Sequence, residues 1–360
     1  MHFGLYLLRV CSVPNVNQPS YEVPVPTVKI ASFNLLNYLE PPMAYYDFQN
    51  IYTLEQWHKK QAWITRFLDK NQPDIIGFQE VFSSESLQSL LEKAGYPYYA
   101  VIDSPTVIDD FIYRSPVVAI ASKFPITEIS TVTADQHAAT LLGLHDFHFS
   151  RKPLRATINI PHIGLTDCYV THFKSKRSLF DDPLPSTIVP SDTALSRFAG
   201  QRLGSWGSAM LRGTEANLLL LAILKQRESS ARPMLLMGDF NDELSSSCLE
   251  QLIAGNVFGM SDSDIERLIG YYRLYDSWTL FTQNTEQATL SRPPTHYFGA
   301  KNSVLDYILL SQEFNAQYRG SLFEVSHYHT EDKHLVNSSF EEDGYSTDHA
   351  LPCVTLSLRC

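Results

Sequence analysis

The most constraining feature of the sequence is a series of apolar runs that each end in a cluster of polar residues. These endings read SFN at 32–34, GFQE at 77–80, THFK at 171–174, GDFND at 238–242 and STDH at 346–349. Packing in a buried strand does not require such endings, whereas α/β proteins commonly gather their functional residues where strands end at one edge of a sheet. We therefore expect a sheet fold with one functional edge.

Strand-like and helix-like runs interleave along the whole chain. Strands are expected at 28–34, 74–82, 115–126, 154–160, 168–175, 233–241, 303–311 and 351–358. Helices are expected after a capping box at Thr53, over 83–95 and over 214–229, while 178–206 reads as a surface excursion. Because neighbouring strand pairs suggest antiparallel elements as well, we predict an α/β (α+β) fold, a four-layer sandwich of two packed mixed β-sheets flanked by helices.

Charge and hydropathy exclude some classes of protein. The formal net charge of −11 disfavours tight non-specific binding to nucleic acid or to an anionic membrane, but it is compatible with a local basic patch. No run of 18 apolar residues occurs, so no membrane span is expected. The apolar run at 3–8 is too short and wrongly flanked for a secretory signal, and we expect a cytoplasmic protein.

Domain organisation and thiol chemistry are simple in outline. Residues 1–26 contain several prolines with little periodicity and predict an N-terminal extension, and 27–360 predict a single domain without a dividing linker. The five cysteines are scattered and form no C-x-x-C pair, so we expect free thiols rather than a zinc site or a disulfide framework.

The GDFND segment places a carboxylate and an amide two residues apart. If the strand continues through it, Asp239 and Asn241 face the same side and could reach one small group together. An Asx turn after the strand explains the same pair equally well.

Asp306 stands in LDYILL, where core-type residues flank it on both sides. A buried carboxylate needs a partner, since burying it unpaired costs several kcal/mol. The imidazolium of His349 is a candidate, because the adjacent Asp348 points away from His349 in a strand; a tyrosine or backbone amides could serve Asp306 instead.

Taken together and in this order, the motifs resemble those of the endonuclease/exonuclease/phosphatase superfamily, which has the fold of DNase I and of exonuclease III. The resemblance covers residues 27–358 and is carried by SFN, PDIIGFQE, THFKS, MGDFND, LDYILLS and STDHALP. Thr347 is a mild departure from the family's SDH motif and leaves the Asp-His pair intact. The resemblance implies a DNase I-like fold and a catalytic domain that hydrolyses phosphoesters.

The resemblance also implies a metal site. Its residues are Glu80 as the principal metal carboxylate, with Asn34 and Asp348 nearby. Hard oxygen ligands without cysteine suit Mg²⁺ or Mn²⁺ rather than zinc.

The remaining motif residues receive roles in catalysis. His172 is expected to contact the scissile phosphate, and Asp239 and Asn241 to position the nucleophile and the phosphate. Asp306 is expected to orient His349. We assign water activation to Asp239 and proton transfer to His349, although the two roles could be exchanged.

Basic residues near these motifs suggest the substrate. They are Arg151, Lys152, Arg155, Lys174, Lys176 and Arg177, of which Arg151 and Lys174 are the expected phosphate-binding residues. We therefore predict a monomeric phosphodiesterase with nucleic acid as the first candidate substrate and endonucleolytic cleavage. Alternatives are a phosphomonoesterase, a lipid or small-molecule phosphodiesterase, or a non-catalytic binding protein that keeps the fold.

Overall fold

The computed structural model of the chain describes residues 25–359, apart from 181, 186, 189–192, 256–258, 260, 262, 264–268, 285–289 and 300. Nearly all of the predicted N-terminal extension lies outside these residues, so the division at residue 27 stays a prediction. Cys168, Cys248 and Cys353 are free thiols, as predicted, and the other two cysteines lie outside the described part.

The first sheet has six strands in the order β16-β17-β1-β3-β7-β4. Its strands are β1 (Thr27–Tyr38), β3 (Ile75–Val81), β4 (Tyr98–Val101), β7 (Val117–Ser122), β16 (Phe323–Glu331) and β17 (Leu351–Leu358). β1 pairs in parallel with β3 and antiparallel with β17, so the sheet is mixed.

The second sheet has six strands in the order β12-β15-β11-β10-β9-β8. Its strands are β8 (Ile126–Thr131), β9 (Leu154–Ile160), β10 (Gly164–His172), β11 (Met234–Asp239), β12 (Tyr275–Asp276) and β15 (Asp306–Leu310). It is also mixed, because β10 and β11 are parallel while β11 and β15 are antiparallel. The single strand expected at 115–126 was wrong: β7 ends before Pro125, and β8 begins after it in the other sheet.

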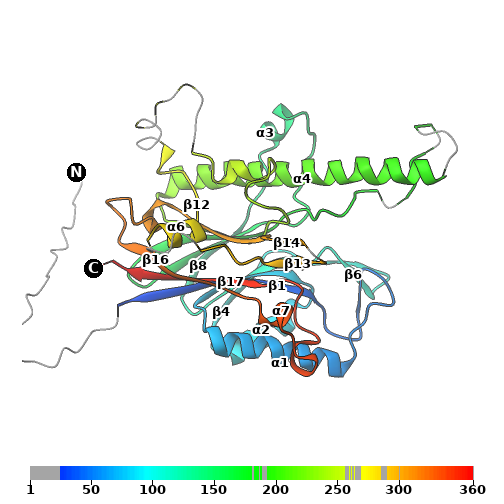
Figure 1. Cartoon of the computed structure of the whole chain (residues 1–360), viewed down its shortest axis with the longest axis horizontal. Helices are drawn as coiled ribbons and strands as arrows, with labels where there is room; N and C mark the ends of the chain where they lie inside the picture. The colour runs from blue at the N-terminus through cyan, green and yellow to red at the C-terminus, as the bar shows by residue number, and fades with distance from the viewer. Residues whose placement is uncertain are drawn as a thin grey trace, which may run out of the picture.

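The two sheets pack face to face, and helices cover their outer faces (Figure 1). α1 (Leu54–Asn71) and α2 (Ser84–Lys93) lie on the first sheet, and α4 (Thr193–Ser230) lies on the second. Three apolar clusters fill the spaces between these layers: one between the sheets, one under α1 and α2, and one under α4. The predicted four-layer sandwich is confirmed, and the capping box at Thr53 and Gln56 starts α1 as expected.

Smaller elements decorate the sandwich. They are β2 (Ala44–Tyr45), β5 (Thr106–Ile108), β6 (Ile112–Arg114), β13 (His296–Phe298), β14 (Lys301–Ser303), α3 (Gln136–Leu141), α6 (Ser277–Gln283), α7 (Lys333–Val336) and α8 (Phe340–Asp343), with 3₁₀ turns at Glu250–Leu252 and Gln312–Phe314. Within the described residues, no helix combines the length and the apolar content that crossing a membrane requires.

α4 is far longer than expected. We predicted a helix over 214–229 and an irregular excursion over 178–206, but the helix spans 38 residues from Thr193 to Ser230. Its N-terminal half contains Gly200, Gly204 and Gly207, which lower the intrinsic helix propensity and hid the helix from sequence reasoning. This half projects beyond the two sheets (Figure 1).

Candidate active site

Three predicted site residues form one row across the second sheet. The parallel register of β10 and β11 places His172 beside Asp239, and the antiparallel register of β11 and β15 places Asp306 beside Asp239. Paired residues on neighbouring strands project from the same face, so strand pairing alone brings the three side chains together. All three are almost fully buried.

Gly238 lets these strands approach. Its φ is +151°, and a Cβ there would lie 1.9 Å from the carbonyl oxygen of Thr171 on β10. A side chain at this position would push β11 away from β10 and separate His172 from Asp239.

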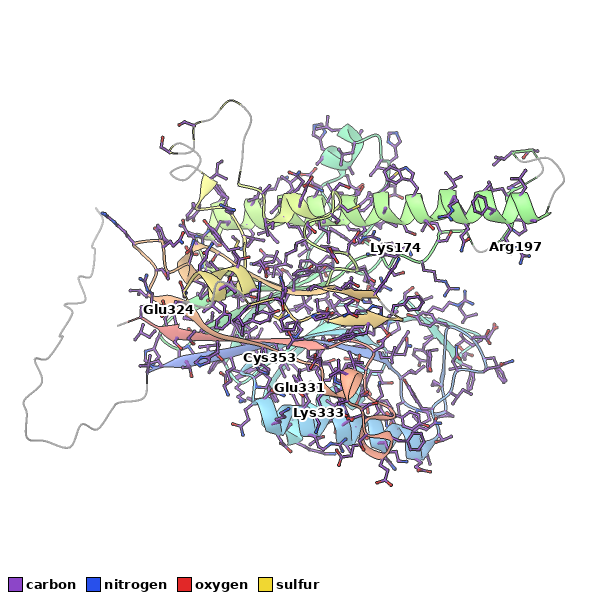
Figure 2. The ribbon with its side chains drawn as sticks, viewed as in Figure 1. Lys174, Arg197, Glu324, Glu331, Lys333 and Cys353 are labelled. Atoms are coloured by element: carbon purple, nitrogen blue, oxygen red, sulfur yellow. The ribbon has the colours of Figure 1, made fainter. Side chains whose placement is uncertain are left out.

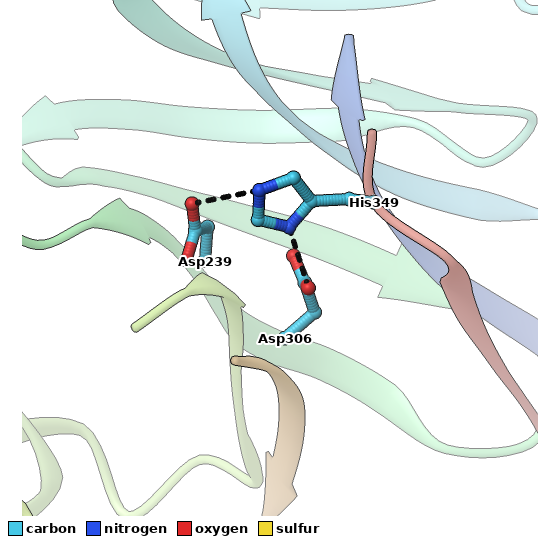
Figure 3. Close-up of side chains that lie close together, drawn as sticks. All are labelled: Asp239, Asp306 and His349. Carbon is cyan, nitrogen blue, oxygen red and sulfur yellow. Dashed lines mark hydrogen bonds and ion pairs between the residues drawn. The ribbon is translucent and has the colours of Figure 1, made fainter. Parts of the chain in front are cut away.

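His349 links the two carboxylates of this row (Figure 3). Its Nδ1 lies 2.8 Å from Oδ2 of Asp306, and its Nε2 lies 3.8 Å from Oδ2 of Asp239. Thr295 fixes the acid, because its hydroxyl oxygen accepts from the backbone amides of Leu305 and Asp306. The buried acid that we predicted therefore faces the predicted histidine rather than a tyrosine.

The buried side chains of the site differ in the direction and cause of their pKa shifts. Burial raises the pKa of Asp239 to about 7, although His349 opposes the rise. Burial disfavours protonation of His349, but Asp306 and Asp239 outweigh it and hold its pKa well above the usual range. Burial, reinforced by Arg151 and His349, holds the pKa of His172 well below that range. Near neutral pH the site thus contains one charged and one neutral imidazole.

The first sheet contributes Asn34 and Glu80 to the same place. The amide nitrogen of Asn34 lies 3.1 Å from Oδ2 of Asp239 and 3.4 Å from Oε1 of Glu80, so it joins the two sheets. Bulges in β1 and β3 aim these side chains, since the strand register shifts after Asn34 and around Glu80. Glu80 itself has a φ of +62°, a left-handed conformation that costs about 1–3 kcal/mol and is typical of functional sites.

The oxygen atoms near Glu80 are suitable ligands for a hard divalent cation. Oε2 of Glu80 accepts from the backbone amide of Asn37, and the side-chain oxygen Oδ1 of Asn37 is buried and has no hydrogen-bond partner among the described residues. Asp348 is exposed. Its carboxylate and that of Glu80 both oppose the fall that burial causes in the pKa of Lys60. Asp239, Asp306 and His349 also lie close enough to share a cation, but a hydrogen bond to Asp306 already occupies Nδ1 of His349.

Asn241 reaches the site through a turn. β11 ends at Asp239, and the backbone amide of Asn241 donates to Oδ1 of Asp239, which is the Asx turn that we had weighed against a continuing strand. The side-chain nitrogen of Asn241 nevertheless lies 3.2 Å from Oδ2 of Asp239 and 3.1 Å from the carbonyl oxygen of Phe173. The side chains of Asp239 and Asn241 thus point into one site, as a continuing strand would also have required.

Comparison with known proteins is consistent with this geometry. The model of the endonuclease/exonuclease/phosphatase family matches residues 31–349. The chain belongs to this family. No curated protein sequence shows significant similarity to it.

Solved structures of the endonuclease/exonuclease/phosphatase fold align with nearly the whole chain. The human nocturnin catalytic domain with bound sulfate has a TM-score of 0.55 and 16% identity over 93% of this chain and 96% of that chain. ANGEL2, described as a 2',3'-cyclic phosphatase, has a TM-score of 0.52 and 15% identity over 93% and 96%. An endonuclease/exonuclease/phosphatase from Beutenbergia cavernae DSM 12333 has a TM-score of 0.51 and 14% identity over 92% and 72%.

The basic residues of this endonuclease/exonuclease/phosphatase protein divide into two groups. Arg151 and Lys174 lie near His172, and one guanidinium nitrogen of Arg151 is 3.4 Å from the carbonyl oxygen of Phe173. Arg155, which we expected beside them, instead pairs with Asp167 across β9 and β10 and lies outside the site. Closeness in the sequence to Arg151 was therefore misleading for Arg155, because its position is set by the pairing of β9 with β10.

Sequence reasoning missed two residues of α4 that hold the site's loops. Glu215 is buried, and its carboxylate accepts from the backbone amides of Ser150 and Lys174. Arg212 donates to the carbonyl oxygen of Lys174 and to the carboxylate of Asp242. Figure 2 shows Lys174 between α4 and the sheets. The signal in the sequence is an arginine and a glutamate three residues apart, just before the apolar run 218–221 of the same helix.

Lys60 was also missed. This lysine of α1 is almost fully buried, and its ammonium donates to the carbonyl oxygen of Ser346, 3.1 Å away, in the segment that carries Asp348 and His349. Burial lowers its pKa to about 7, while Glu80 and Asp348 oppose the fall. The buried ammonium therefore positions the 346–349 segment at a cost in stability.

The stability cost of Lys60 should depend on pH. Because the folded-state pKa lies below the ordinary value, the cost is fully present below pH 7 and disappears as pH rises from about 7 toward 10. In urea unfolding of chelated protein, the stability of Lys60→Met relative to the wild type should fall by about 3 kcal/mol between pH 7 and pH 9.5. Lys59→Met, at an exposed neighbour, should show a much smaller change. A pH-independent difference for Lys60→Met would refute the assignment.

Proposed function

We propose that the protein is a divalent-metal-dependent hydrolase of phosphodiester bonds. The observation that carries the proposal is the buried arrangement of Asp306, His349 and Asp239 beside Asn34 and Glu80. Hydrolysis of a phosphoester requires a base for water, a proton donor and charge neutralisation, and this cluster offers a group for each.

Each side chain has a task in this scheme. Asp239, with its raised pKa, accepts the proton of the attacking water. His349 is held protonated by Asp306 and donates a hydrogen bond or a proton to a phosphate oxygen. Asn241 and the neutral His172 position the phosphate. The exchange of roles between Asp239 and His349 stays open.

Glu80, Asp348 and Asn34 would hold Mg²⁺ or Mn²⁺. When bound, such an ion neutralises the non-bridging phosphate oxygens and favours attack by water. The side-chain amide of Asn34 hydrogen-bonds both Glu80 and Asp239, so it would also set the distance between the metal carboxylate and the base.

Nucleic acid is the first candidate substrate, because Arg151 and Lys174 offer positive charge next to His172. Lys176 and Arg177 extend that charge, although Lys176 also pairs with Asp242 at 2.8 Å. With so few contacts, we expect modest affinity and a log–log salt slope of about −3 at most.

Replacing Lys176 and Arg177 with alanine tests this substrate. The double variant should raise KM for DNA several-fold and flatten the salt dependence, because fewer counterions are released. Hydrolysis of bis-nitrophenyl phosphate should stay nearly unchanged, since this small ester does not reach the pair. Steady-state kinetics at two salt concentrations provide the measurement.

Two outcomes would contradict the assignment. Equal loss of both activities would place Lys176 and Arg177 in the catalytic machinery or in folding. A wild type that ignores DNA and RNA at low salt with Mn²⁺, yet cleaves bis-nitrophenyl phosphate, would refute the nuclease proposal and leave the phosphodiesterase proposal intact.

A lipid phosphodiester is the second candidate. The observation that favours it is the exposed apolar surface of α4. The same helix contacts the site, because Arg212 donates to the carbonyl oxygen of Lys174. An assay panel of plasmid DNA, RNA, a phosphodiester phospholipid in vesicles and a phosphomonoester distinguishes the two candidates from each other and from a monoesterase.

A further inference from the structure

The N-terminal half of α4 carries an exposed apolar face. Its members are Leu195, Phe198, Leu203, Trp206 and Met210, each between 49% and 63% exposed. At 3.6 residues per turn these positions fall on one side of the helix. Exposed apolar patches of this kind mark interaction surfaces on a folded protein.

The opposite side of this half of α4 is already filled. A Cβ on Gly204 would lie 2.0 Å from the hydroxyl oxygen of Ser178, and one on Gly200 would lie 3.3 Å from the backbone oxygen of Asp182. The glycines therefore let residues 178–180, 182 and 184 pack directly on the helix backbone. Because that side is covered by its own chain, the apolar face points away from the fold.

Charge distinguishes this half of α4 from the rest of the protein. Residues 193–211 include two arginines and no Asp or Glu, whereas the whole chain has a net charge of −11. Arg197 and Arg202 are exposed, and the guanidinium of Arg202 lies 5.0 Å from the centroid of the Phe198 ring. Arg197 lies near the projecting end of the helix (Figure 2). At 3.6 residues per turn Arg202 falls among the apolar residues, whereas Arg197 falls on the side of Gly200 and Gly204.

We propose that the apolar face of α4 docks on an anionic phospholipid surface. An amphipathic helix with arginines beside tryptophan and phenylalanine can lie in the plane of the interface, with its apolar side chains among the acyl chains and its cations at the headgroup phosphates. Pairing this face with the same face of a second copy fits less well, since it would bring together two helix halves that contain arginines and no acids.

The site loop contacts the buried side of α4, away from the apolar face. The hydroxyl of Ser208 donates to the carbonyl oxygen of Arg177, and Arg212 donates to that of Lys174. These hydrogen bonds connect the helix that carries the docking surface to the site loop. Docking itself goes beyond the proposed hydrolysis and requires no catalysis.

Trp206 supplies a direct probe of docking. It is the exposed tryptophan of the four, because Trp57 and Trp63 are buried and Trp278 packs against Tyr328. We expect the full-length protein in chelator to cosediment with vesicles of phosphatidylcholine and phosphatidylglycerol, with a blue shift of its fluorescence, and to leave pure phosphatidylcholine vesicles largely unbound. Added salt should weaken binding.

Variants separate the apolar and the cationic contributions. Phe198→Ser with Trp206→Ser should lower the affinity for anionic vesicles about ten-fold or more, because two large side chains no longer enter the bilayer. Arg197→Glu with Arg202→Glu should remove the preference for anionic lipid. Trp206→Phe should bind without the blue shift.

Matched controls lie elsewhere on the surface. Phe340→Ser replaces a phenylalanine that is 94% exposed on α8, and Arg319→Glu replaces an exposed arginine. Both should bind vesicles like the wild type.

Several results would overturn the proposal. They are absence of binding to anionic vesicles, binding without a blue shift in the wild type, and equal weakening by the control variants. A dimer in light scattering that Trp206→Ser dissociates would assign the face to a second copy, and loss of DNA binding in the same variants would assign it to nucleic acid. Failure of hydrolysis with intact vesicle binding would refute only the proposed enzyme.

Discussion

Replacing Asp306 with asparagine should lower kcat by about 10²- to 10⁴-fold, the range that positioned proton transfer contributes. The carboxylate that keeps His349 protonated and oriented lies 2.8 Å from its Nδ1. Asparagine has nearly the same shape but no charge, so the pKa of His349 should fall while the ring stays in place. The activity of Asp306→Asn should therefore lose its alkaline side at a lower pH than that of the wild type.

The double variant tests whether Asp306 and His349 act as a unit. His349→Ala should lose at least as much activity as Asp306→Asn, and adding Asp306→Asn to it should cost little more. Steady-state kcat for the four proteins closes the cycle, and thermal unfolding checks that each is folded. Multiplicative losses would show that Asp306 acts elsewhere or only stabilises the fold. Asp332→Asn, at an acid that contacts Tyr297 outside the site, serves as the control.

Removing the metal should abolish hydrolysis. We expect dialysis against chelator to reduce the rate by several orders of magnitude and Mg²⁺ or Mn²⁺ to restore it, since without the ion the carboxylates of Glu80 and Asp348 would repel the phosphate. Glu80→Gln should weaken metal affinity by at least about 100-fold, because even outer-shell partners of a metal commonly contribute 10–100-fold. Calorimetric titration measures this affinity without any substrate.

The glutamine variant is chosen to preserve the fold. Its side-chain oxygen can still accept from the backbone amide of Asn37, as Oε2 of Glu80 does. Thermal stability in chelator should therefore change little. Glu40→Gln, at an exposed acid just beyond β1, should keep wild-type metal affinity. Unchanged affinity in Glu80→Gln, or full hydrolysis after chelation, would rule out Glu80 as the metal carboxylate.

Strand ends made much of the site predictable from sequence. His172 and Asp239 each stand at the end of an apolar run, Asp306 stands inside one, and strand register sets the three side by side. What the sequence could not show is the local backbone. The left-handed conformation of Glu80 belongs to a bulge that no periodicity reveals, and the sequence could not decide between a turn and a continuing strand at Asn241.

Residues that act through a neighbour were hidden for a different reason. Lys60 occupies a buried position of an amphipathic helix, and its partner Ser346 is distant in the chain. Glu215 likewise satisfies backbone amides of segments far from α4. Arg155 shows the opposite error. Its place in a basic run suggested that it shares a surface with Arg151, but it pairs with Asp167 instead. Long-range pairing, which decides all three, is absent from local patterns.

The pairing of β1 with β17 has a consequence for biosynthesis. Ile30 near the start of the fold lies opposite Val354 near its end, and the site joins Asn34 to the segment that precedes β17. During translation one edge of the central strand β1 therefore stays unpaired until residues 351–358 have left the ribosome. A nascent chain that still lacks His349 cannot assemble the cluster of Asp239, Asp306 and His349, so under the proposed function it would not yet cleave phosphoesters. The same delay leaves an unpaired edge that a chaperone could cover.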